Sequence, residues 1–249
     1  MEPIVPKLIL VPTDFSAPSA QALRYGAALA ERFSAHLLVI YADPFMPAVD
    51  FSISAAGVFD LPREEMVESA REQLQTFAEM HIPAAVSYDV RVVVSMPVDA
   101  IVAQASEVGA GLIVMGTHGR TGLRRLLIGS VTEAVMRLAP VPVIVVHEET
   151  PLGAAAMRRI VSRTCSTKET AAAVAYARVF AAANVDMFPE SADLIAIAGA
   201  RRADLIVLGV RNTMAERIVQ RSACPVLTAN EYVARAVGSV VDAHVPSIA

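Results

Sequence analysis

The sequence predicts an α/β protein with a doubly wound parallel sheet, and two observations support this prediction. Short apolar runs such as Leu112-Ile113-Val114-Met115 show no polar alternation, which is typical of strands buried on both faces of a parallel sheet. Between these runs, apolar residues recur every three or four positions, as on one face of a helix. Strands that alternate with helices are joined by right-handed crossovers, so helices should cover both faces of the sheet.

The composition fits buried strands covered by alanine-rich helices. Hydrophobic residues make up 55% of the chain and the mean hydropathy is +0.50, yet no run approaches the ~18 apolar residues of a membrane span. No secretory signal is visible at the amino terminus, so the expected location is the cytoplasm. A net charge of −4, a pI near 5.8 and 5% aromatic residues make nucleic acid an unexpected partner, and the lack of a spanning run makes a membrane unexpected as well.

Each predicted element follows from a local pattern. Ser16 is a good N-cap and Pro18 suits a first turn, so a helix should follow the first strand there. Residues 43–61 have no sustained period and indicate a long loop, a candidate mobile flap over the site. The predicted strands lie at residues 7–12, 36–42, 85–95, 112–115 and 142–146, and the predicted helices begin near residues 16, 62, 97 and 130.

Three glycines lie between the 112–115 strand and the next helix: Gly116, Gly119 and Gly129. Glycine permits positive φ and allows the backbone to approach a ligand closely. The first turn of a helix has unpartnered N–H groups and a partial positive charge, which together favour phosphate. The pattern therefore indicates an anion site. Ordinary turn glycines in a solvated basic loop are the alternative.

Side chains around the helix start would complete this anion site. Ser130 or Thr132 can cap the first turn and add hydroxyl donors. Arginines in the loop would attract phosphate at longer range. These arginines are Arg120, Arg124 and Arg125, and the predicted apolar face of the helix comprises Val131, Val135 and Leu138.

Asp14 lies in the turn after the first strand. Open α/β sheets bind ligands at the carboxyl ends of their strands, which makes this aspartate a candidate ligand-binding residue. A purely structural role, as a cap or in an Asx-turn, is the alternative reading of the same residue.

The pattern Gly116-x2-Gly119-x9-Gly129-Ser130, between an apolar strand and a final Pro-Val-Ile-Val-Val strand, resembles the nucleotide-binding signature of the universal stress protein family, in its ATP-binding branch. The resemblance covers residues ~5–147 well. It implies a five-stranded sheet of order 3-2-1-4-5 that is Rossmann-like and similar to the adenine nucleotide α-hydrolase group. In that order the first and fourth strands are neighbours, so Asp14 and Gly116 would face one crevice.

The resemblance also implies a ligand and the residues that bind it. The ligand would be ATP or another adenine nucleotide, with Asp14 at the adenosine and the backbone of Ala42 at the adenine edge. Mg²⁺ would then bind through the phosphates, because the sequence shows no carboxylate pair for a dedicated site. The implied nucleotide-binding residues are Pro12, Thr13, Asp14, Ala42, Met115, Gly116, His118, Gly119, Arg120, Gly129, Ser130, Val131 and Thr132.

The second half of the chain is predicted to be a degenerate, truncated copy of the first, in tandem. Residues 204–209 echo residues 111–116, but Gly209 and Pro225 are 16 positions apart where Gly116 and Pro142 are 26 apart. About ten residues of phosphate loop are therefore missing, and so is one strand-helix pair. We expect this half to bind no nucleotide.

The predicted domains are residues 1–148 with the nucleotide site, a linker at 149–157, the degenerate copy at 158–232 and a tail at 233–249. In the family that the chain resembles, the last strand of the sheet pairs across a dimer. Here the expectation is either a homodimer or an intrachain pseudo-dimer through the last strand of each copy.

Other chemistry has little support in the sequence. Neither a Walker-type loop nor a dinucleotide fingerprint occurs, and Cys165 and Cys224 fit no metal-binding spacing. We find no catalytic residues and no metal ligands, so at most slow ATP hydrolysis is expected. The alternative function is a dimeric interaction or scaffold protein of the same fold that uses no nucleotide. An enzyme of the wider hydrolase-like group is the weakest reading.

Overall fold

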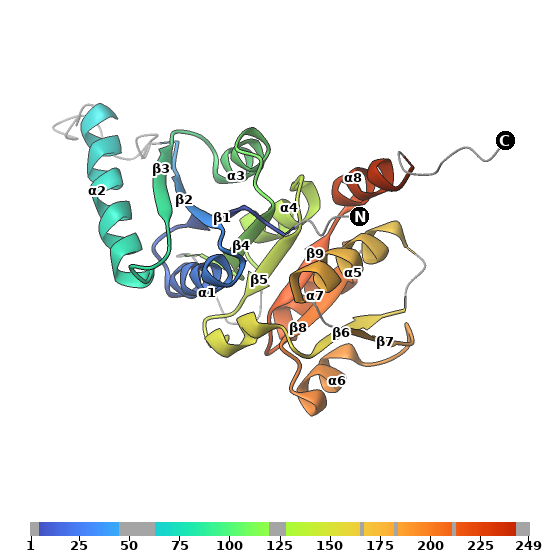
Figure 1. Ribbon diagram of the computed structural model, residues 1–249. Helices are drawn as coiled ribbons and strands as arrows, with labels where there is room; N and C mark the ends of the chain where they lie inside the picture. Colours follow the sequence, from blue (N-terminus) through green and yellow to red (C-terminus); the bar gives the residue numbers. More distant parts are fainter. Residues whose placement is uncertain are drawn as a thin grey trace, which may run out of the picture.

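The computed structural model describes residues 5–44, 63–119, 128–164, 167–181, 184–210 and 213–242. Their strands form one nine-stranded sheet of order β3-β2-β1-β4-β5-β9-β8-β6-β7, shown in Figure 1. The strands are β1 (Leu8–Thr13), β2 (His36–Ala42), β3 (Tyr88–Val93), β4 (Leu112–Gly116), β5 (Val143–Val146), β6 (Ile160–Arg163), β7 (Val185–Phe188), β8 (Leu205–Gly209) and β9 (Val226–Ala229).

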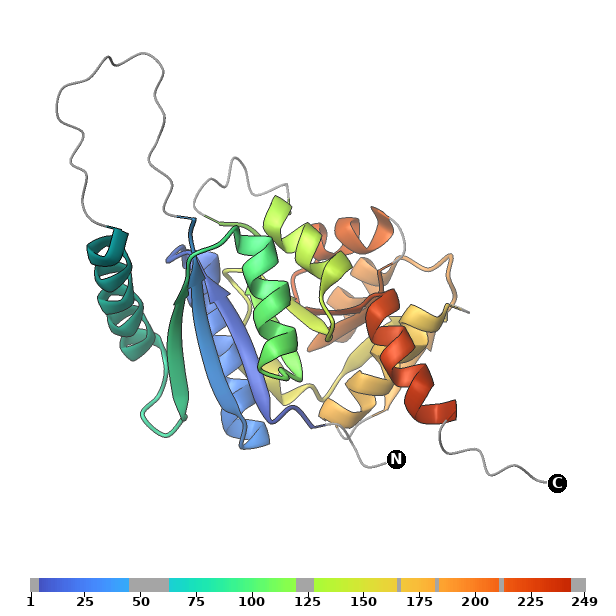
Figure 2. The ribbon, with the colours of Figure 1, turned by 90° about the horizontal axis from the view of Figure 1, so that it is seen from above.

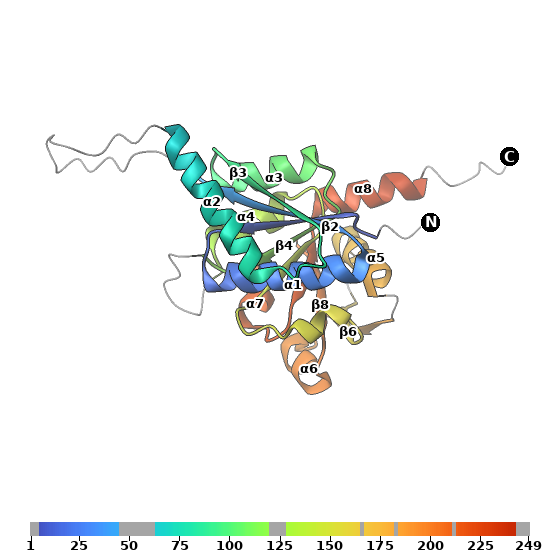
Figure 3. The ribbon, with the colours of Figure 1, turned by 60° about the vertical axis from the view of Figure 1, so that its left-hand side comes forward.

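Eight α-helices and a short 3-10 helix accompany this sheet in the described residues. They are α1 (Ala17–Phe33), α2 (Arg63–His81), α3 (Pro97–Glu107), α4 (Ser130–Leu138), η1 (Leu152–Ala156), α5 (Lys168–Ala181), α6 (Leu194–Arg201), α7 (Thr213–Arg221) and α8 (Glu231–Asp242). Figure 3 shows α1 on one side of the first-half strands and α3 and α4 on the other. None of the helices in the described ranges combines the length and apolar character needed to cross a membrane.

The central strands are buried because successive side chains enter two different cores. Ile9 and Val11 pack with α1 on one face, while Leu10 between them packs with α3 and α4 on the other. Leu112 and Ile113 of β4 divide in the same way. This explains why the strands are continuous apolar runs, and the predicted five-strand order 3-2-1-4-5 is confirmed for β1 to β5.

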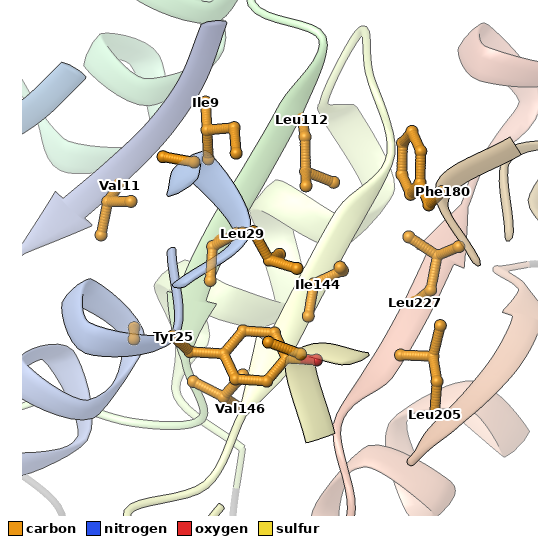
Figure 4. Close-up of a cluster of buried hydrophobic side chains, with 14 of the residues drawn as sticks. Ile9, Val11, Tyr25, Leu29, Leu112, Ile144, Val146, Phe180, Leu205 and Leu227 are labelled. Atoms are coloured by element: carbon orange, nitrogen blue, oxygen red, sulfur yellow. The ribbon is translucent and has the colours of Figure 1, made fainter. Parts of the chain in front are cut away.

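The two halves of the chain are joined through their last strands. β5 and β9 pair antiparallel, with Ile144 opposite Leu227, whereas the other paired strands of the described sheet are parallel. The sequence left open whether the last strands pair between two chains or within one chain. In this structure they pair within one chain. Figure 4 shows Ile144 beside Tyr25 of α1, with Leu227 and Leu205 of the second half continuing the same cluster.

The strand order of the second half is that of the first with one strand fewer. Its order β7-β6-β8-β9 corresponds to 2-1-4-5 of the first half, so the expected loss is visible in the sheet. Residues between the halves are built into the core, since Ala154, Ala155 and Met157 are buried. Figure 2 shows α2 at one end of the molecule and α8 at the other. The domain boundaries themselves remain predictions.

One predicted helix face is wrong in part. Leu138 was expected to point inward from α4, but its side chain is 45% exposed. The buried face instead includes Thr132, Val135, Met136 and Ala139, at spacings of three, one and three. Leu138 lies two positions beyond Met136, which turns it toward solvent.

Candidate nucleotide cleft

A cavity of about 270 Å³ lies where β1 and β4 end side by side. All the site residues predicted from sequence line it except Arg120, which lies outside the described residues together with Arg124, Arg125 and most of the 43–61 loop. The predicted residues brought together there are Pro12, Thr13, Asp14, Ala42, Met115, Gly116, His118, Gly119, Gly129, Ser130, Val131 and Thr132.

Asp14 is fixed by the turn that starts α1. Its Oδ1 accepts hydrogen bonds from the Ser16 amide at 3.1 Å and the Ser16 hydroxyl at 2.5 Å. This is the Asx-turn that the sequence offered as an alternative role. The same carboxylate also lines the cavity, so structural and binding roles are compatible.

The residue after Asp14 holds a strained backbone conformation. Phe15 has φ +66°, a region that non-glycine residues seldom adopt. Its ring packs against Tyr41 at 4.8 Å and Phe77 at 5.3 Å between centroids, and these contacts hold it there. The strained residue therefore fixes the direction of the chain at the edge of the cleft.

The cleft glycines are required by close packing rather than by unusual dihedral angles. A Cβ on Gly119 would stand 2.3 Å from Oδ2 of Asp14, and one on Gly116 would stand 2.9 Å from the Pro18 carbonyl. A Cβ on Gly129 would lie 3.2 Å from the His118 Cα. Among the described glycines only Gly109 has positive φ, so the cleft glycines use the other property of glycine, its freedom to lie close to neighbouring atoms.

The amino terminus of α4 opens into the cavity. The first intrahelical hydrogen bond runs from the Glu133 amide to the Gly129 carbonyl at 2.9 Å. The amides of Ser130, Val131 and Thr132 therefore have no partner within the helix, and all three residues line the cavity. This arrangement is suited to an anion.

The predicted side-chain cap of α4 is wrong. Gly129 occupies the N-cap position and no side chain caps the helix. The Thr132 hydroxyl instead donates to the Gly116 carbonyl at 2.9 Å, and its residue is buried. Thr132 thus ties α4 to the end of β4 and has no hydroxyl proton left for a phosphate, whereas Ser130 is exposed at the helix start.

Three lining residues were not predicted as site residues: Ser19, Pro97 and Ile101. Ser19 lies 2.9 Å from the Thr13 hydroxyl and donates to the Ser16 carbonyl, which braces the first turn of α1. Pro97 and Ile101 belong to the start of α3, one helical turn apart. The available signal was their position after β3, at the same edge of the sheet as Asp14.

The cavity offers few charged groups. Among the described residues, Asp14 is the only acidic residue that lines it, and no three of their side chains form a group that could hold a metal ion. A neighbouring hollow of about 330 Å³ shares His118 with the cleft and includes His147. Burial lowers the pKa of His147 below its usual 6.5, and the nearby His118 lowers it further.

The corresponding region of the second half is built differently. β8 ends at Gly209 and α7 begins at Thr213, whereas β4 and α4 are separated by residues 117–129. Gly209 packs against α5, since a Cβ there would lie 2.5 Å from the Thr170 amide. The Gly209 amide donates to the Thr170 hydroxyl at 3.2 Å. The connection between β8 and α7 is therefore too short to surround a phosphate group.

Comparison with known proteins gives consistent results for the first half. The model of a family described as the universal stress protein family matches residues 6–147. A universal stress protein of Methanocaldococcus jannaschii is 36% identical over 142 residues, covering 57% of this chain and 82% of the relative. A second relative, a universal stress protein of Bacillus subtilis, is 29% identical over 146 residues, covering 56% of this chain and 97% of the relative.

A solved structure matches both halves. The crystal structure of a universal stress protein from Archaeoglobus fulgidus aligns over 92% of this chain and 99% of its own, with a TM-score of 0.66 and 18% sequence identity. At that identity the likeness concerns the fold alone.

Proposed function

The chain belongs to the universal stress protein family, and from this premise we propose that its first half binds an adenine nucleotide, ATP in the first instance, in the cleft between β1 and β4. The supporting observation is the convergence of three unlike features on one cavity. These are the amide groups at the start of α4, the Asp14 carboxylate and a glycine-lined wall.

These features divide the ligand between them. Amides at a helix amino terminus suit phosphate oxygens, and an aspartate suits the hydroxyl groups of a ribose. Ala42 at the end of β2, with Met115, Ile101 and Val131, supplies an apolar surface for a base. The role of such a protein would be in a stress response or in signalling, through the nucleotide-bound form.

Magnesium would reach this cleft with the nucleotide. A single carboxylate cannot build a dedicated Mg²⁺ site, because this ion is held by carboxylates together with substrate phosphates and water. Hydrolysis would be slow at most, since the described lining residues include no second carboxylate to orient a water molecule. The cleft is thus suited to binding rather than turnover.

Calorimetric titration with ATP tests the proposal, together with analysis of any adenine nucleotide released when freshly purified protein is denatured. Gly129→Leu should abolish binding, because its Cβ would already crowd the His118 backbone at 3.2 Å. Gly153→Leu is the matched control, since a Cβ there meets nothing within 4 Å.

The result decides between this function and an interaction protein that uses no nucleotide. The proposed site would be excluded if the protein bound no adenine nucleotide supplied at millimolar concentration. Unchanged ATP binding by a folded Gly129→Leu variant would exclude it as well. A nucleotide-free scaffold would then be the better description of the same fold.

A further inference from the structure

A second cavity, of about 450 Å³, lies in the second half of the chain. Its walls are mostly apolar and come from η1 and α6, with Ala154 on one side and Ile195 and Ala198 on the other. Cys224 contributes a half-buried thiol. The volume falls within the range of about 300–1,000 Å³ that is usual for small-molecule pockets.

This cavity is separate from the nucleotide cleft and from its degenerate copy. It is lined by residues just before the strands of the second half, namely Arg159 before β6, Asp204 before β8 and Cys224 before β9. A degenerate nucleotide cleft would lie at the other end of β8, beyond Gly209. The cavity shares no lining residue with the cleft at Asp14.

The charged groups around the cavity are unequal in number. Among the described residues, three arginines line it, Arg159, Arg202 and Arg221, against one acidic residue, Asp204. Asp204 is already engaged, because its Oδ2 accepts from the Arg158 and Arg159 amides at 3.0 Å and its Oδ1 lies 3.2 Å from Arg159 Nη2.

The other two arginines leave an excess of positive charge at the cavity. Neither Arg202 nor Arg221 has a carboxylate partner within the described part of the chain, and both are exposed. Arginine forms strong, often bidentate hydrogen bonds with carboxylates. An apolar chamber with free guanidinium groups at its edge matches a ligand that has an apolar body and an anionic head.

We propose that this cavity is a second binding site, for an amphipathic carboxylate of medium chain length. The apolar tail would lie between η1 and α6, and the carboxylate would pair with Arg202 and Arg221. Apolar area removed from water supplies the affinity, and the guanidinium pair supplies the selectivity for an anion.

Decanoate is the test ligand and decanol its neutral counterpart. The fluorescent anion 8-anilinonaphthalene-1-sulfonate should bind saturably, and decanoate should displace it while decanol should not. Decanoate should also protect Cys224 from alkylation, measured by peptide mass mapping, because that thiol lines the cavity.

Two variants test the location without unfolding the protein. Gly199→Phe should fill the cavity, since a Cβ on Gly199 meets nothing within 4 Å and glycine is a poor helix residue. Its affinity for decanoate should fall at least about tenfold. Gly153→Phe adds the same ring at another open glycine that does not line the cavity, and it should bind normally.

The charge variant is the double substitution Arg202→Gly and Arg221→Gln. Arg202 has φ +50°, which glycine adopts more easily, so this change should not cost stability. Decanoate affinity should fall about tenfold or more, while Arg178→Gln with Arg217→Gln, two exposed arginines away from the cavity, should leave it unchanged.

Three outcomes would overturn the proposal. The first is the absence of saturable decanoate binding, and the second is binding that survives Gly199→Phe. The third is equal binding of decanol and decanoate with no effect of the arginine changes, which would mark a nonspecific apolar patch. ATP titration of the same variants reports on the cleft separately, so failure here does not bear on the proposed function.

Discussion

At the scale of single residues, several side chains serve packing where the sequence suggested chemistry. Thr132 was expected to hold phosphate, but its hydroxyl joins α4 to the Gly116 carbonyl. The sequence left open whether Gly116 and Gly129 adopt positive φ or allow close approach, and the structure shows the second, because backbone lies close to each of them. In these cases the sequence correctly marked the position as important. The role of each residue depends on its neighbours in the fold and could not be predicted.

Tyr25 offers a test of stability at a single atom. Its ring is fully buried between the halves, and its hydroxyl has no hydrogen-bond partner among the described residues. A buried unsatisfied hydroxyl costs about 1–3 kcal/mol. Tyr25→Phe should therefore raise the free energy of unfolding by about 1 kcal/mol, measured by chemical denaturation.

The control for Tyr25→Phe is Tyr176→Phe, whose side chain is half-buried and whose hydroxyl is not among the orphaned groups. It should change the free energy of unfolding little. A loss of stability in Tyr25→Phe would contradict this prediction, because it would show that the hydroxyl has a hydrogen-bond partner in solution.

His147 should make stability depend on pH. Because burial holds its pKa in the folded state below 6.5, the unfolded chain binds the proton more readily. Its contribution is fully present above pH 6.5 and is lost as the pH falls through 6.5 toward the lower folded pKa. Between pH 8 and pH 5, the melting temperature of the native protein should fall more than that of His147→Gln. Parallel curves would contradict this.

At the scale of elements, most of the fold followed from the sequence. Strand β2 and the start of α1 matched their predicted positions, because apolar runs and the Ser16 cap are local signals. The side on which Leu138 lies was not predictable, since it depends on how α4 is rotated against the sheet. The contribution of Ile101 to the cleft also depended on packing, because its apolar character fits a core equally well.

Two glycines, Gly209 at the end of β8 and Gly119 three residues beyond the end of β4, should respond differently to the same change. Gly209→Ala should destabilise the fold by about 1–3 kcal/mol, because its Cβ would overlap the Thr170 backbone. Gly119→Ala should cost little stability, because the overlapping atom belongs to the rotatable Asp14 carboxylate. It should instead lower ATP affinity about tenfold by displacing that carboxylate.

Thermal melts and ATP titration of both variants make the comparison. The reverse pattern, with Gly119→Ala unfolded and Gly209→Ala impaired in ATP binding, would refute the assignment of roles. Equal loss of stability in both would show that Asp14 cannot rotate away.

At the scale of the whole molecule, the two halves share one hydrophobic core on each face of a continuous sheet. Sequence could identify two related halves, but it could not decide whether the last strands pair within a chain or between chains. The apolar run Val143–Val146 is equally suited to either partner. Only the relative placement of β9, which depends on many tertiary contacts, resolves that choice.

A shared core predicts a single cooperative unfolding transition. Leu227→Ala, at a fully buried position of β9, should lower the free energy of unfolding by about 2–5 kcal/mol. The whole transition should shift to lower denaturant, followed by circular dichroism and by tyrosine fluorescence. Separation of the curve into two steps would mean that the halves fold independently.

Because β5 and β9 pair antiparallel, the strands of the second half run in the opposite direction to those of the first half. The carboxyl ends of β1, β4 and β5 lie at the same edge of the sheet as the amino end of β9. The Asp14 cleft and the cavity beside Cys224 therefore both lie at that edge. The carboxyl ends of the first-half strands therefore share an edge with the amino ends of the second-half strands. Occupancy of either cavity would therefore alter the same edge of the sheet.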